Sequence, residues 1–171
     1  LISFHTYASG QNWKPAQDGD KIILIRHAKA PGGGDPEGFK IGDCKTQRNL
    51  DIMGINQAKK IGKFFKEKKV KIDKVLSSQW CRCKDTAKYA FGDFKEFSAL
   101  NSTYTPPYDQ NENQQIEDLK TYVNNWNGNG GNLVLVTHYV IILAITGATT
   151  RSGELVITDK NFKVLSKINT F

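Results

Sequence analysis

The sequence predicts an α/β domain of three layers (α/β/α) with a mixed, mostly parallel central sheet. Three short apolar segments rich in β-branched residues, at 21–25, 72–78 and 133–137, are typical of strands buried on both faces. They alternate with segments of helical period, and this alternation indicates a largely parallel sheet. The length of 171 residues fits one domain. We therefore expect residues 1–171 to form a single domain with an N-terminal arm at residues 1–20.

Each element follows from its local pattern. Residues 1–20 are polar and carry Gly, Asn and Asp, which predicts an extended arm or loop. In segment 54–69 apolar side chains recur on one face and lysines on the other, which predicts an amphipathic helix. Segment 114–126 has a similar apolar spacing and ends before the turn-forming run Asn-Gly-Asn-Gly-Gly-Asn. Gly147 is the expected end of a helix, and a hairpin is expected around 159–161.

The expected elements, in chain order, are a strand at 21–25, a helix at 54–69, a strand at 72–78, a helix through Phe91, a helix at 114–126, a strand at 133–137, a helix to about Ile145, and hairpin strands at 154–158 and 162–168. The hairpin supplies an antiparallel edge to the sheet.

The net charge of +7 comes almost entirely from one lysine run. Residues 59–74 hold eight lysines against Glu67 and Asp73, a balance of +6, and the remaining 16 basic and 15 acidic residues leave +1. The run contains no arginine and no aromatic pattern suited to base stacking, so nucleic-acid binding is not the main interpretation. We interpret the lysines as a solvated helix face, with a patch that attracts anions as the alternative.

Three cysteines are too few for a disulfide framework, and their spacing matches no zinc site. Cys81 and Cys83 lie too close in sequence to bridge each other comfortably, so one disulfide, if any, joins Cys44 to either of them; three free thiols are the alternative. No apolar run reaches the ~18–20 residues of a membrane span. The compartment stays open between export (periplasmic or secreted), which we favour, and the cytoplasm.

Polar side chains follow three of the expected strands at the point where each strand ends. Arg26 and His27 follow the first strand, a turn that leads to Arg82 follows the second, and His138 follows the third. Ligands of open α/β sheets bind beyond the carboxyl ends of the strands, so these side chains are expected to converge. A single histidine in this position is usually structural, but two histidines and two arginines together predict a site.

This set of residues suits phosphoryl transfer. Arginine binds phosphate oxygens with a planar, bidentate fork. A neutral imidazole can attack phosphorus and carry a covalent phosphoryl group, and a second, protonated imidazole adds positive charge. No carboxylate cluster accompanies these residues, so we expect neither a metal nor another cofactor.

Five segments carry a resemblance to a known family: Leu24–Ala28, Thr46–Leu50 with Gly54 and Gln57-Ala58, Leu76–Ser78 with Arg82, Thr86 and Ala87, Leu135–His138, and Ser152–Glu154. In this order they resemble the motifs of the histidine phosphatase superfamily, which has the phosphoglycerate-mutase-like fold. The resemblance covers about residues 20–158. The chain is most similar to short members that lack a cap insertion.

The resemblance implies a role for each matching residue. His27 corresponds to the phosphorylated nucleophile, and Arg26 and Arg82 to the residues that hold phosphate oxygens. His138 would close the pocket. Arg48 is a candidate for substrate binding at the rim, with a structural salt bridge as the alternative. The third histidine, His5, has no counterpart and is expected at the surface.

Two departures from the family pattern stand out. Ala28 replaces the signature glycine, a small change that could slightly shift the nucleophile loop. Many members also carry a glutamate proton donor in a Leu-x-Glu context, whereas this chain has Leu100 followed by Asn-Ser-Thr. Asp109, and after it Glu112, are the candidate replacements in the same loop. Without a strong donor, good leaving groups are favoured.

The sequence thus favours a metal-independent phosphomonoesterase that acts through a phosphohistidine intermediate. A mutase is disfavoured because the chain has no insertion long enough to close the pocket. The alternative is a non-catalytic phosphate-binding or signalling module of the same fold, and a third class, a basic binding protein, depends on the lysine run alone. The expected partner is a phosphorylated substrate, with no nucleic acid; its identity and the oligomeric state stay open.

Overall fold

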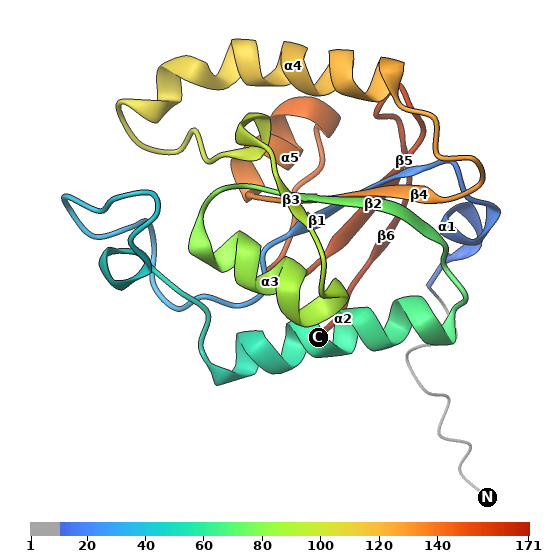
Figure 1. Cartoon of the computed structure of the whole chain (residues 1–171), viewed down its shortest axis with the longest axis horizontal. Coiled ribbons are helices and arrows are strands. Elements are labelled where there is room, and N and C mark those ends of the chain that lie inside the picture. The colour runs from blue at the N-terminus through green and yellow to red at the C-terminus, as the bar shows by residue number, and fades with distance from the viewer. Residues whose placement is uncertain (1–10) are drawn as a thin grey trace, which may run out of the picture.

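A six-stranded mixed sheet forms the centre of the molecule, with strand order β3-β2-β4-β1-β5-β6 (Figure 1). The structure is a computed structural model, and it describes residues 11–171. The strands are β1 Ile22–Arg26, β2 Ile72–Ser77, β3 Lys95–Glu96, β4 Asn132–Thr137, β5 Leu155–Thr158 and β6 Val164–Ile168. The helices are α1 Lys14–Asp18, α2 Ile52–Glu67, α3 Cys81–Phe91, α4 Glu112–Asn125 and α5 Tyr139–Thr146.

Strands β1, β2, β3 and β4 run parallel, whereas β5 pairs antiparallel with both β1 and β6. The last two strands form the antiparallel hairpin expected at this edge. The predicted three-layer α/β fold with a mixed, mostly parallel sheet is therefore confirmed. Because β1, β2 and β4 are parallel, their carboxyl ends lie at the same edge of the sheet.

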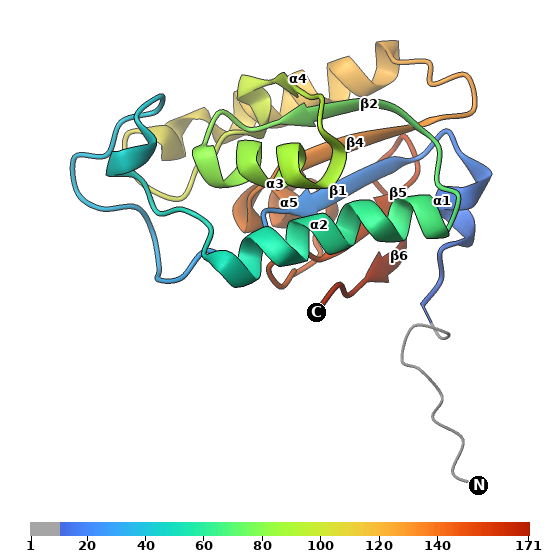
Figure 2. The ribbon, with the colours of Figure 1, turned by 60° about the horizontal axis from the view of Figure 1, so that its bottom comes forward.

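The helices cover both faces of the sheet. Helices α2 and α3 lie on one face together with α1, and α4 and α5 lie on the other (Figures 1 and 2). Alternate side chains of β1 enter the two cores: Ile23 and Ile25 face α2 and α3, whereas Ile22 and Leu24 face α4 and α5. This double burial explains why the strand reads as a continuous apolar run.

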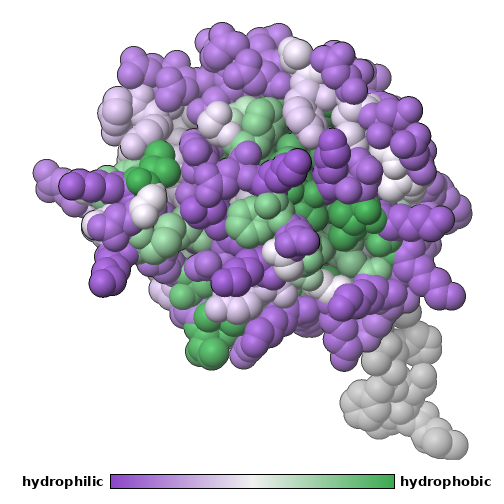
Figure 3. All heavy atoms as spheres, viewed as in Figure 1, coloured by the Kyte–Doolittle hydropathy of each residue, from purple (hydrophilic) through white to green (hydrophobic). Residues whose placement is uncertain are grey.

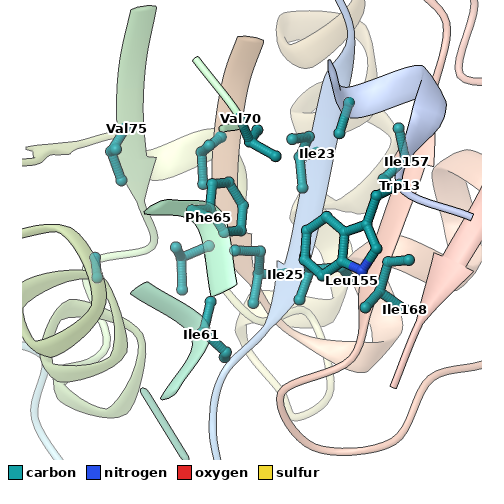
Figure 4. Close-up of a cluster of buried hydrophobic side chains, with 14 of the residues drawn as sticks. Trp13, Ile23, Ile25, Ile61, Phe65, Val70, Val75, Leu155, Ile157 and Ile168 are labelled. Carbon is teal, nitrogen blue, oxygen red and sulfur yellow. The ribbon is translucent and has the colours of Figure 1, made fainter. Parts of the chain in front are cut away.

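The segment expected to be an extended N-terminal arm contains a short helix in its described part. Residues 1–10, including His5, lie outside the described part of the chain. Residues Lys14–Asp18 form the short helix α1, and Pro15 stands in its first turn, where a proline is favoured. Trp13 is only 6% exposed and packs with Leu155 and Ile168 in the core of Figure 4. Burial of this indole anchors the segment to the domain.

The remaining elements fall where the sequence predicts them. The expected helix at 54–69 begins two residues earlier, where Asp51 caps α2 by accepting a hydrogen bond from the N–H of Gly54 at 2.8 Å. Gly147 ends α5 in the left-handed conformation, at φ 73°. The two-residue strand β3 was not expected, because so short a segment has no period. Within residues 11–171, no helix is long and apolar enough to cross a membrane.

The lysine run lies on the outer face of α2 and at the start of β2. All but one of its eight lysines are exposed, and Lys68 is half-buried. Figure 3 shows hydrophilic side chains over most of one molecular face, with apolar side chains gathered near the edge of the sheet at β2. A groove of about 910 Å³ lies there and is lined by Lys66 and Lys74 among others. The run is therefore a solvated surface and is separate from the cavity described next.

Candidate active site

Side chains from the ends of β1 and β4 meet at one edge of the sheet. The strand register sets Arg26 beside Thr137, and His27 and His138 follow directly. Their ring centroids lie 5.6 Å apart. Both face a cavity of about 270 Å³. The cavity is lined by Arg26, His27, Gly32, Gly33, Gly34, Asp35, Arg48, Arg82, Ser102, Tyr104, Thr105, His138, Tyr139 and Val140. Five of the six predicted site residues are thus brought together; Asp109 is not among them.

His27 is held in one tautomer. Its Nδ1 lies 2.8 Å from the carbonyl oxygen of Ala28, and because a carbonyl can only accept, Nδ1 carries the hydrogen. Its Nε2 therefore keeps a lone pair and accepts a hydrogen bond from Arg82 Nε at 3.3 Å. The loop is fixed in turn by the Ala28 N–H, which donates to Thr86 Oγ1 at 2.9 Å.

Burial keeps His27 neutral. The ring is 3% exposed, and this burial, together with the charge of Arg82, holds its pKa well below the usual range. The hydrogen bond to Ala28 works in the opposite direction but is outweighed. At neutral pH the side chain is therefore an unprotonated imidazole with a lone pair at Nε2, which is the form that can attack phosphorus once the hydrogen bond from Arg82 is exchanged for the phosphate.

The pKa of His138 is lowered as well, which favours the neutral form of its imidazole. Burial, followed by the charge of Arg82, holds its pKa well below the usual range. Its Nε2 lies 2.9 Å from Ser78 Oγ, whose own hydrogen points to Asn101 Oδ1 at 3.3 Å. Nε2 therefore donates to Ser78, and Nδ1 faces Arg82 Nη2 at 3.5 Å with a lone pair.

Arg82 lies in the first turn of α3 and connects both histidines. Its Nε and Nη2 face the rings of His27 and His138, as given above, while Nη1 donates to Asp35 Oδ1 at 2.8 Å. The side chains of this ion pair are 4% and 6% exposed. The guanidinium is thus nearly buried among groups of the site, at the wall of the cavity.

Arg26 and Arg48 complete the positive lining of the cavity. Arg26 Nη1 donates to the carbonyl oxygen of Thr150 at 2.6 Å, and its guanidinium lies 5.4 Å from the centre of the Tyr139 ring. Arg48 Nη1 donates to the carbonyl oxygen of Ala30 at 2.6 Å, so it supports the loop after β1 rather than a salt bridge. Within the described chain, the Nε atoms of both arginines are buried without a hydrogen-bond partner. Donors of this kind are available to an anion.

Asp35 is a site residue that the sequence analysis missed. It follows three glycines in the loop after β1, and its carboxylate lines the cavity. Burial alone would raise its pKa, but the hydrogen bond from the Arg48 N–H and the charge of Arg82 outweigh this effect and lower it. The signal for Asp35 in the sequence was an acidic residue directly after a run of glycines. Its approach to the arginines is seen only in the structure.

The proposed replacements for the missing proton donor do not lie at the cavity. Asp109 is exposed in the 3-10 helix Tyr108–Asn111, and Glu112 accepts a hydrogen bond from Thr103 Oγ1 at 2.9 Å. Ser102 lines the cavity instead. Among the described residues, Asp35 is the only carboxylate in the lining, and its lowered pKa makes it a poor proton donor.

The predicted disulfide is confirmed, and it joins Cys44 to Cys81. It ties the segment that leads to Arg48 to the start of α3. Gln47 strengthens this link because its Oε1 accepts a hydrogen bond from the Cys81 N–H at 2.9 Å. Cys83 is a free thiol, and burial raises its pKa to about 12. This thiol is therefore inert rather than nucleophilic.

Comparisons with known proteins agree with this fold. Residues 22–102 match the histidine phosphatase superfamily (branch 1). The phosphoglycerate mutase of Thermus thermophilus is 17% identical, with a TM-score of 0.62 over 87% of this chain and 98% of that chain. The provisionally assigned phosphohistidine phosphatase SixA of Agrobacterium tumefaciens is 18% identical, with a TM-score of 0.59 over 88% and 97%. No curated protein sequence matches the chain.

These comparisons confirm the resemblance to the histidine phosphatase superfamily that the motifs predict. The structural likeness shows the fold, and the family match supports activity of the phosphatase type without naming the reaction. His138 lies beyond the matched segment, so its inclusion in the site depends on geometry alone.

Proposed function

We propose that the protein is a phosphoric monoester hydrolase that acts through a phosphohistidine intermediate at His27 and needs no metal. The observation that carries this proposal is the state of His27: a buried, neutral imidazole whose Nδ1–H is bound to a carbonyl and whose Nε2 faces a cavity lined by arginines. Three guanidiniums against one carboxylate leave an excess of two positive charges, which matches a phosphate dianion.

In the first step Nε2 of His27 attacks phosphorus. A nitrogen–phosphorus bond forms while the bond from phosphorus to the leaving oxygen breaks, and that oxygen takes its proton from solvent. Arg82 and Arg26 hold the equatorial oxygens, where negative charge is concentrated. These guanidiniums supply the charge stabilisation that a metal supplies in other phosphoryl-transfer enzymes, so we expect activity in the presence of a chelator.

In the second step water attacks the phosphoryl group from the side opposite His27. The nitrogen–phosphorus bond breaks, its electron pair returns to Nε2, and the water loses a proton to solvent as inorganic phosphate forms. His138 lies beside this path, with its Nδ1 toward Arg82. It assists by hydrogen bonding and does not carry the phosphoryl group, because its Nε2 is bound to Ser78.

The lining of the cavity favours substrates with good leaving groups. Its one described carboxylate, Asp35, has a lowered pKa and is bound to Arg82, so no strong acid faces the leaving oxygen. Aryl phosphates, acyl phosphates and phosphoramidates need little protonation as they leave, whereas alkyl phosphates need it. We therefore expect turnover to fall steeply as the pKa of the leaving group rises.

A non-catalytic phosphate-binding module is the second candidate. No carboxylic acid lies beside Ser102 in the described cavity. This favours the binding module, because the arginines and histidines that would bind phosphate are present without an acid for catalysis. This candidate requires phosphate binding without turnover and without a covalent intermediate.

The test compares wild type with His27→Ala and His138→Ala on a panel of phosphomonoesters with chelator present. His27→Ala should abolish turnover and the acid-labile, base-stable label. His138→Ala should slow turnover by ~10²–10⁴ and keep some label, since it removes one assisting group.

His5→Ala is the matched control because His5 is the one histidine of the chain that is not assigned to the site. It should keep both turnover and label. If His27→Ala still traps phosphate on a histidine, the nucleophile has been assigned wrongly. If wild type binds phosphate but neither hydrolyses esters nor becomes labelled, the binding module is the correct function.

A further inference from the structure

The guanidinium of Arg82 is held from behind by Asp35. Asp35 Oδ1 accepts from Nη1, while the opposite edge of the guanidinium, Nε and Nη2, faces His27 and His138. This edge carries the parallel N–H pair with which arginine binds two phosphate oxygens. The edge that points toward the nucleophile is therefore the one suited to phosphate.

We propose that Asp35 is the positioning residue that fixes this edge of Arg82 for the phosphoryl group. The inference rests on the proposed function, because it assumes that Arg82 binds the phosphate. Asp35 accepts from Nη1, the nitrogen that points away from the histidines, and so restrains rotation of the guanidinium about its stem. The carbonyl oxygen of Arg48 accepts from the same nitrogen at 3.4 Å. It acts through Arg82 and does not touch the reacting atoms.

Asp35 is itself fixed by two further donors. Its Oδ1 also accepts from the Arg48 N–H at 3.0 Å, and its Oδ2 accepts from Trp80 Nε1 at 3.0 Å. Trp80 is 1% exposed and stands directly before α3, so the donor is rigid. The carboxylate thus joins three segments: the glycine loop, the segment of Arg48 and the start of α3.

The preceding glycines allow the loop to turn Asp35 inward. Gly32 and Gly34 have φ of 93° and 76°, which other residues adopt only under strain. The requirement at Gly34 is conformational rather than steric, because a Cβ there would make only an ordinary contact, at 3.7 Å, with the ring of Tyr104. The glycine run therefore serves the placement of Asp35 as well as the shape of the cavity.

A carboxylate suits this position because of the charges around it. Arg26, Arg48 and Arg82 all line the cavity, and without a counter-ion their charges repel one another. Asp35 neutralises one of these charges and leaves an excess that a phosphate dianion balances. Removal of Asp35 leaves the buried Arg82 without its partner, which frees it to move toward another acceptor.

The test is a double-mutant cycle between Asp35 and Arg82. Wild type, Asp35→Ala, Arg82→Ala and the double variant are compared for kcat/KM on p-nitrophenyl phosphate and for affinity toward inorganic phosphate. Asp35→Ala should lower kcat/KM by ~10–100-fold, less than the ~10²–10³-fold for losing an oriented donor outright, because Arg82 itself is kept. In the Arg82→Ala background the same substitution should change it less than about threefold, because the residue it positions is gone.

Two further variants separate positioning from folding. Asp35→Asn keeps an acceptor oxygen for Arg82 and should recover at least about tenfold of the loss, whereas a general loss of structure would not respond to this rescue. Asp93→Asn, an exposed aspartate outside the cavity, is the matched control and should leave kcat/KM unchanged.

The outcomes also distinguish this inference from the proposed function. Equal losses from Asp35→Ala in both backgrounds would overturn the positioning role even if wild type is an active phosphatase. If wild type shows no turnover but the cycle on inorganic phosphate is strongly coupled, the positioning role holds and the hydrolase assignment fails.

Discussion

Reduction of the Cys44–Cys81 disulfide should lower the free energy of unfolding by about 4 kcal/mol. The two cysteines are 37 positions apart, and the chain-entropy relation for a closed loop of that length gives ~3.8 kcal/mol at 25 °C. For a domain of this size each kcal/mol corresponds to about 2–4 °C, so the midpoint of thermal unfolding should fall by about 8–15 °C. The disulfide also ties the Arg48 segment to α3, so the reduced protein should bind phosphate more weakly.

Urea denaturation of the oxidised and reduced protein measures the difference. Thiol counting under denaturing conditions should give one free thiol, Cys83, before reduction and three after it. The double variant Cys44→Ser/Cys81→Ser should match the reduced protein and should not respond to reductant, which controls for other effects of the reagent. If wild type keeps its midpoint of unfolding after complete reduction, the loop-closure reasoning is wrong.

Two further predictions concern the histidines and the lysines. Burial and Arg82 lower the pKa of both His27 and His138, so below about pH 6.5 the unfolded chain binds protons that the folded chain does not. The free energy of unfolding should therefore fall as pH falls, by up to about 2.7 kcal/mol per pH unit for two groups, and urea denaturation between about pH 7 and 5 measures this slope. A profile that stays flat over this interval would contradict the neutral state of both rings. Replacing Lys63, Lys66 and Lys69 with Gln should leave turnover on a small ester within a few-fold, because none of them lines the described cavity. A loss of about a hundredfold, ~2.7 kcal/mol, would place the lysines in the site.

The fold could be predicted because its central strands are buried on both faces. In β1 and β4 almost every residue enters one of two cores, so their apolar runs identify them and leave few other arrangements. Helix α2 could be predicted equally well, because its apolar side chains recur on one face. Helix α1 was not, because its anchor is the contact of a single side chain, Trp13, with residues distant in sequence. Burial of that kind leaves no periodic pattern in so short a helix.

The site was predictable only where a strand determines the position of a side chain. Arg26, His27 and His138 follow directly from strands whose register is fixed. Asp35 lies on an irregular loop, and its place depends on contacts with Arg82, Trp80 and the Arg48 backbone. Asp109 also lies in an irregular segment, so its position could not be predicted. It follows Ser102 and Thr105 in the sequence, which line the cavity, but it does not line the cavity itself.

The charge of Arg82 contributes to the ionisation of three groups that line the cavity. It lowers the pKa of His27, of His138 and of Asp35, so both imidazoles are neutral and the carboxylate is charged. A bound phosphate dianion adds two negative charges close to the same rings and opposes this effect. We therefore expect the pKa of His138 to rise when a phosphate binds, which favours the imidazolium that the sequence predicts.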